Sequence, residues 1–194
     1  LAEYRKRPQG LPDLLNPFAL VADGVVLGKD GSLLSSWWYA GPDMESATEN
    51  EMAVLSGQLN AALVGLGNGW MIQADALRRP AVGYPGEGAF PDRTTRLLDA
   101  GRRAFYSSGE ATYESRYALT VTYLPPPDVQ AKVGDFFVEG EQSERTGWEL
   151  VLRSFERSRD QLEDALSDRL ALSRMDSEAL LAFLAYCVTG LAHP

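Results

Sequence analysis

The sequence predicts an α+β fold: an antiparallel or mixed sheet in the chain order β-β-α-β-α-β with helices on one face, followed by a C-terminal helical pair. Three observations carry this prediction. Two β-branched and aromatic segments flank an Asp-Gly turn near the start of the chain. Two further strand patterns are each preceded by a helical pattern, and two apolar repeats of helical spacing fill the C-terminal region.

The predicted domain boundaries follow changes in composition. We expect an extended N-terminal arm at 1–23, an α+β domain at 24–127, an acidic linker at 128–144, and a helical segment at 145–194 that begins a lobe continuing further. Prolines 8, 12 and 17 exclude a long helix from the arm. Its basic run, Arg5-Lys6-Arg7, could contact an anionic membrane or nucleic acid, or could be a solvated charge run.

The first hairpin is predicted from residues 24–27 and 32–39, joined by Lys29-Asp30-Gly31. The Trp37-Trp38-Tyr39 sequence places aromatic rings on both faces of the second strand. Either both faces pack in the core, or one tryptophan anchors an interface.

The next elements are two helices and two strands. A capping box, Ser46…Glu49 or Thr48…Glu51, begins the first helix, and a glycine cluster ends it. A strand at 70–77 follows. The second helix begins near Asp92, and Tyr113 to Leu124 alternates as the last strand. The apolar residues expected to face inward are Met52, Leu55, Leu59, Leu63 and Leu66 in the first helix, and Leu97, Leu98, Gly101, Ala104 and Phe105 in the second.

The C-terminal part begins with acidic residues, Asp135, Glu139, Glu141 and Glu144, whose spacing matches no calcium loop and favours a solvated linker over a cation site. Residues 146–172 have the spacing of one amphipathic helix. The helix at 177–188 is apolar on nearly every side and must be buried, so we expect it to form a contact surface. The interface candidates are Trp37, Trp38, Leu180, Leu181, Phe183, Leu184 and Val188.

Composition excludes several classes of function. The net charge of −9 argues against a nucleic-acid footprint over the whole domain. The Arg78-Arg79 and Arg102-Arg103 pairs nevertheless keep open a free-standing adaptor or a single-stranded nucleic-acid-binding α+β domain. One cysteine, Cys187, excludes an internal disulfide and suits the cytoplasm. No uncharged apolar stretch reaches the roughly 18 residues that span a membrane.

The sequence predicts no catalytic, cofactor-binding or metal-binding residue. With His193 as the one histidine, a triad or metal site that needs an internal histidine is excluded. The nearest approach to a phosphate-binding loop runs from Gly24 to Asp30. It is one residue short, and Asp30 stands where a hydroxyl should bind magnesium.

A series of short strings resembles the N-terminal region of the CagE/TrbE/VirB family of type IV secretion ATPases, and most of all its TrbE-type conjugal-transfer members. The strings cover nearly the whole chain, and their order and spacing are more specific than any one of them. They are Asp23-Gly24-Val25-Val26-Leu27, Lys29-Asp30-Gly31-Ser32, Gly41-Pro42-Asp43, Arg78-Arg79-Pro80-Ala81, Tyr84-Pro85, Phe90-Pro91-Asp92, Arg102-Arg103, Glu114-Ser115, Tyr123-Leu124-Pro125-Pro126, Leu172-Ser173-Arg174-Met175-Asp176-Ser177, Cys187, Thr189-Gly190 and His193-Pro194.

The resemblance implies a non-catalytic docking and oligomerisation region. Its partners would be inner-membrane components of a secretion channel and further copies of itself, with nucleic acid disfavoured. It would lie on the cytoplasmic face of the bacterial inner membrane without a transmembrane segment of its own. ATP and magnesium would bind a C-terminal domain that drives pilus assembly and substrate transfer, and no residue of this chain matches the motifs of that domain.

Overall fold

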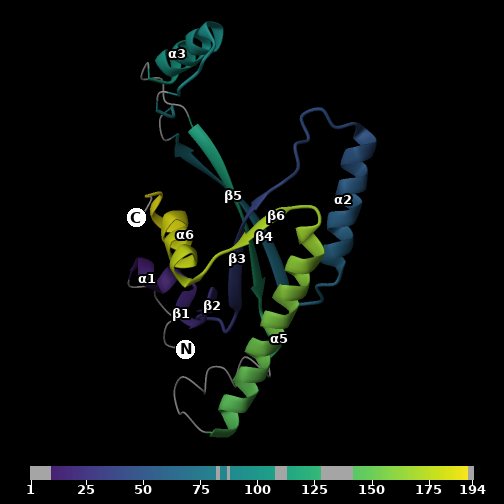
Figure 1. Ribbon diagram of the computed structural model, residues 1–194. Helices are drawn as coiled ribbons and strands as arrows, with labels where there is room; N and C mark the ends of the chain where they lie inside the picture. The colour runs from purple at the N-terminus through teal and green to yellow at the C-terminus, as the bar shows by residue number, and fades with distance from the viewer. Residues whose placement is uncertain (1–9, 82–83, 87, 108–112, 128–141, 192–194) are drawn as a thin grey trace. The chain divides into compact units, whose positions relative to one another are not determined.

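The computed structural model describes residues 10–81, 84–86, 88–107, 113–127 and 142–191, and it confirms the predicted α+β fold (Figure 1). The chain divides into two compact units, residues 1–75 with 118–194 and residues 76–117. The strands are β1 (Pro17–Ala22), β2 (Val25–Gly28), β3 (Leu33–Ala40), β4 (Trp70–Pro80), β5 (Tyr113–Tyr123) and β6 (Ala171–Arg174). The helices are α1 (Leu11–Leu14), α2 (Glu49–Val64), α3 (Arg93–Ser107), α5 (Gln142–Ser167) and α6 (Ser177–Thr189).

The sheet has the strand order β1-β2-β3-β5-β4, and β6 also pairs with β3. Its first strand lies within the predicted N-terminal arm and pairs antiparallel with β2, with Leu20 opposite Val26. Residues 17–22 are therefore extended, as expected, but they belong to the sheet. The predicted domain boundaries themselves stay a prediction.

The predicted β2–β3 turn is confirmed, and its residues explain it. Gly31 has a φ of +81°, a conformation that glycine adopts without the steric cost of a Cβ. The backbone N–H of Gly31 donates to the carbonyl of Gly28 at 3.0 Å. The Asp30 carboxylate accepts from the backbone N–H of Ser32 at 3.0 Å and from Asn16 at 3.0 Å.

The main core lies between one face of the sheet and helix α5. Trp37 on β3 is completely buried there, together with Phe155 and Leu162 of α5. Phe155 stacks on Trp70 with ring centroids 5.6 Å apart. The helical spacing read from the sequence thus identifies the buried face of this helix correctly.

The end of α5 differs from the prediction. The helix ends at Ser167 instead of Leu172, and residues 171–174 form β6, which pairs with residues 37–40 of β3. Strand β2 pairs with β3 only near its start, at Leu33 and Leu34. The rest of that β3 edge is therefore open, and β6 supplies its hydrogen bonds.

Helix α6 lies on the opposite face of the sheet from α5. Successive residues of a strand point to opposite faces, so Trp38 faces away from the Trp37 core. Its ring meets Phe183 of α6 edge-on, at 5.6 Å between centroids. Helices were expected on one face of the sheet; within this unit, α5 and α6 contact different faces (Figure 1).

Helix α2 covers the core only in part. The capping box that forms is the second of the two alternatives, with Thr48 and Glu51 bonded reciprocally. Leu59, Leu63 and Leu66 pack against the core cluster, but no residue of α2 is fully buried and Met52 is exposed. The predicted apolar stripe is thus correct in direction and shallower than expected.

Helix α3 corrects the prediction most clearly. Its apolar residues were expected to face inward, yet Leu97, Leu98 and Phe105 are 65%, 62% and 58% exposed. The reason is the small size of the unit formed by residues 76–117, in which no second layer covers this face in the described ranges. The sequence identified the apolar face but not its exposure.

Candidate functional site

The described residues offer surfaces and a structural polar network, and no chemical centre. No group of three or more His, Cys, Asp or Glu residues in the described ranges could hold a metal ion. Gly28 donates its backbone N–H to Ser32 at 2.7 Å, and the Lys29 ammonium donates to the carbonyl of Pro12. These contacts hold the Gly-Lys step in a hairpin turn, where a phosphate-binding loop would need the start of a helix.

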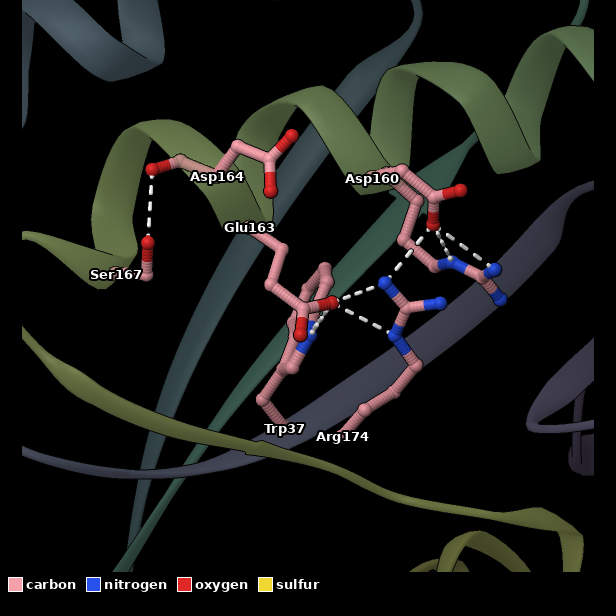
Figure 2. A network of polar contacts seen from close by, with 7 residues as sticks. Trp37, Asp160, Glu163, Asp164, Ser167 and Arg174 are labelled. Carbon is pink, nitrogen blue, oxygen red and sulfur yellow. Dashed lines mark hydrogen bonds and ion pairs between the residues drawn. The ribbon is translucent and has the colours of Figure 1, made fainter.

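A polar network joins α5, β3 and β6 (Figure 2). Glu163 accepts from the indole N–H of Trp37 at 2.9 Å and from Arg174 Nε at 2.7 Å. Arg174 also lies 2.9 Å from Asp160, which accepts from Arg159 at 3.1 Å. The network ties three elements that are far apart in the chain, so its role is to position β6 and α5 on β3.

Sequence reasoning missed this network. Arg159 stands where the apolar repeat of α5 lapses, which suggested a weakly packed position. The residue is instead buried, and its Nη1 has no hydrogen-bond partner in the described part of the chain. Because burying a cation is costly, Arg159 depends on its ion pair with Asp160.

A second polar contact fixes the start of α6 to the β1–β2 turn. The Asp23 carboxylate accepts from the Ser177 hydroxyl at 2.8 Å and from its backbone N–H at 3.1 Å. The hydroxyl bond, followed by the backbone bond, lowers the pKa of Asp23 below its ordinary value. Gly24 in turn donates its N–H to the Ser177 hydroxyl at 3.1 Å.

The structure separates the predicted interface residues into covered and open groups. Trp37, Leu180 and Phe183 are buried, and Trp38 and Leu184 are half-buried. Leu181 and Val188 are 47% and 43% exposed. Complete burial of α6, as the sequence predicted, is wrong for the described residues, because the sheet covers one side of the helix only.

The predicted basic residues do not form one phosphate-binding row. Arg5, Lys6 and Arg7 lie outside the described residues. In each remaining pair one side chain is exposed and the other is partly enclosed. Arg78 stacks over Tyr113 at 5.1 Å, while Arg79 is half-buried. Arg102 is exposed, while Arg103 pairs with Asp99 at 2.8 Å.

A shallow hollow of about 570 Å³ lies on the exposed face of α3. Its lining residues are Tyr84, Leu97, Leu98, Gly101, Arg102, Phe105 and Tyr106. Below it, Tyr84 donates to Asp99 at 2.9 Å, which raises the pKa of Tyr84, and the hydrogen bond from Arg103 lowers the pKa of Asp99. Sequence reasoning missed this surface because it took the apolar face to be covered.

None of the helices in the described part combines the length and the apolar composition that crossing a bilayer requires.

Comparisons with known proteins agree with the resemblance seen in the sequence. Residues 24–131 match the family model described as type IV secretion system ATPase VirB4/TrbE, N-terminal domain. The conjugal transfer protein TrbE of Rhizobium radiobacter is 36% identical over 211 aligned residues, which cover this whole chain and 26% of that protein. A second relative, the first part of a probable conjugal transfer protein TrbE from Sinorhizobium fredii (strain NBRC 101917 / NGR234), is 46% identical over 127 residues, covering 64% of this chain and 85% of that protein.

The chain thus spans about a quarter of the length of the Rhizobium radiobacter relative and most of the shorter Sinorhizobium fredii one. The family model and the shorter relative agree in placing the similarity in the N-terminal region. The chain belongs to the VirB4/TrbE family of type IV secretion system ATPases and corresponds to its N-terminal domain.

Proposed function

We propose that this chain is the non-catalytic docking and oligomerisation region of a conjugal-transfer ATPase. It docks on inner-membrane components of the secretion channel, at the cytoplasmic face of the membrane, and associates with further copies of itself. A domain outside these 194 residues binds ATP and magnesium and energises pilus assembly and substrate transfer. The observation that carries the proposal is the open apolar side of α6.

The contacts of α6 support a docking role because they orient the helix. Leu180 and Phe183 are buried against the sheet, and the Asp23–Ser177 contact holds the first turn. Leu181 and Val188 are seven residues apart, two helical turns, so they share the opposite side. Apolar side chains held open by a fixed helix are typical of a contact surface.

The docking role predicts interference with the full-length protein. Expressing this chain in donor cells that carry the full-length protein should lower the frequency of conjugal transfer. By mass action, a tenfold excess of a chain with equal affinity leaves about a tenth of the docking sites to the full-length protein. The measurement is transfer frequency per donor against the level of the chain.

A matched pair of variants tests whether the open side of α6 is responsible. The Leu181→Glu, Val188→Glu variant should not interfere and should sediment as a monomer. The control, Val64→Glu with Leu150→Glu, adds the same charges at exposed apolar positions on α2 and α5 and should behave as the unaltered chain. Equal interference by both variants, or none by the unaltered chain, contradicts the proposal.

The proposal also predicts that the chain alone neither binds nor hydrolyses ATP. Because Gly28 and Lys29 lie in a hairpin turn, their backbone N–H groups are not arranged around a phosphate. Titration calorimetry with Mg-ATP should give only the heat of dilution. Micromolar binding that Lys29→Ala abolishes would show that the turn does hold a nucleotide.

A further inference from the structure

We propose that α3 is a membrane-contact helix whose apolar face enters the headgroup region of an anionic lipid bilayer. The inference rests on the proposed function only in placing the chain at a membrane. Its evidence is the exposure of the apolar face, the fixation of the opposite face, and the charge around both.

The apolar face of α3 is continuous and open. Leu97, Leu98 and Phe105 are all more than half exposed, and Gly101 lies among them with no heavy atom within 4 Å of the position of a Cβ. Together they line the hollow of about 570 Å³. A surface with large apolar side chains at its centre is unfavourable in water and favourable at a lipid interface.

The opposite face is held by its own unit, so the orientation of the helix is set. Asp99 accepts from Arg103 and from Tyr84. Arg103 also donates to the carbonyl of Pro85 at 2.8 Å, and the Tyr84 ring stacks on Tyr106 at 5.6 Å. These contacts use the side of α3 that faces away from Leu97, and they leave the apolar side outward.

The charge of this unit is opposite to that of the chain. Residues 76–117 contain seven arginines against five acidic residues, whereas the whole chain carries a net charge of −9. Arg93, Arg96 and Arg102 are exposed, and none of them forms an ion pair with another described residue. On a helix of 3.6 residues per turn, Arg93 and Arg102 lie on the two sides of the apolar stripe.

An apolar stripe bordered by arginines is the pattern of helices that lie in a membrane interface. The aliphatic side chains enter the acyl boundary while the guanidinium groups stay at the level of the lipid phosphates. The open face of α3 suits nucleic acid less well, since DNA and RNA offer no apolar phase for Leu97 and Leu98. Anionic lipid therefore satisfies both the apolar and the basic groups of this surface.

The test uses the 194-residue chain and vesicles that contain no protein. We expect it to float with vesicles containing about 30% phosphatidylglycerol and to bind pure phosphatidylcholine vesicles at least about tenfold more weakly, with binding that weakens as salt rises. Leu97→Glu with Phe105→Glu should reduce binding about tenfold or more. The control, Val54→Glu with Val64→Glu, adds the same charge at exposed positions of α2 and should leave binding unchanged.

A spectroscopic readout separates insertion from adsorption. All four native tryptophans lie outside residues 76–117. The added ring in Phe105→Trp should shift its emission to the blue on phosphatidylglycerol vesicles and be quenched by brominated lipid. Val64→Trp should show neither effect. An unchanged thermal midpoint in each variant confirms that the fold is kept.

Several results would overturn the inference. They are a chain that ignores phosphatidylglycerol vesicles, an α3 variant that binds as well as the unaltered chain, and binding without quenching of the Phe105→Trp ring. Binding of single-stranded DNA or of an acidic helical peptide, without vesicle binding, would assign the surface to that partner. A chain that interferes with transfer but ignores vesicles refutes the lipid contact alone, whereas one that binds vesicles without interfering refutes the docking role alone.

Discussion

Replacing Trp37 by alanine should lower the free energy of unfolding by about 3–5 kcal/mol, as expected for a large aromatic side chain removed from a core. Trp37 is completely buried in the cluster that joins β3 to α5. The change removes this ring and also the N–H group that donates to Glu163. Urea unfolding followed by circular dichroism measures the loss.

Two further variants separate the packing contribution of Trp37 from that of its hydrogen bond. Trp37→Phe keeps a ring and removes the N–H donor, and a double-mutant cycle with Glu163→Gln should give a coupling free energy of about 1 kcal/mol. Trp38→Ala, at the half-buried neighbouring position on the other face, should cost clearly less than Trp37→Ala. Equal costs at the two positions would mean that the core does not lie on the Trp37 face.

Replacing Gly24 by alanine should destabilise the protein by about 2–4 kcal/mol, through two causes. Gly24 has a φ of +63°, which is strained for a residue with a Cβ. That Cβ would also lie 2.3 Å from the carbonyl oxygen of Met175, so the backbone before α6 would have to move. The movement would disturb the contacts of Asp23 and Gly24 with Ser177.

Gly190 provides a matched control because it has nearly the same backbone conformation without the close neighbour. Its φ is +70°, and no heavy atom lies within 4 Å of its Cβ position. Gly190→Ala should therefore cost only the strain of the positive φ, about 1 kcal/mol. The difference between the two thermal unfolding free energies measures the collision with Met175, and equal values would show that the two segments are not in contact.

Local chemistry in the sequence was sufficient for several elements. Asp30 and Gly31 supply the hydrogen bonds and the positive φ of the β2–β3 turn within four residues of chain. Thr48 and Glu51 begin α2 through a capping box whose partners are three residues apart. These features depend on neighbours in the chain, so they could be predicted without knowledge of the fold, as could the family from its ordered strings.

Tertiary structure alone decided which apolar surfaces are covered. The periodicity of α3 and α6 defines an apolar face on each, but burial depends on what packs there, and both Leu97 and Leu181 remain exposed. Strand β6 exists because the β3 edge beyond β2 is open to it. The Trp37–Glu163 hydrogen bond joins residues 126 positions apart. The sequence by itself therefore determined the turns, the caps and the apolar faces, which act over a few residues; the covering of those faces depends on contacts between distant segments, which no local pattern encodes.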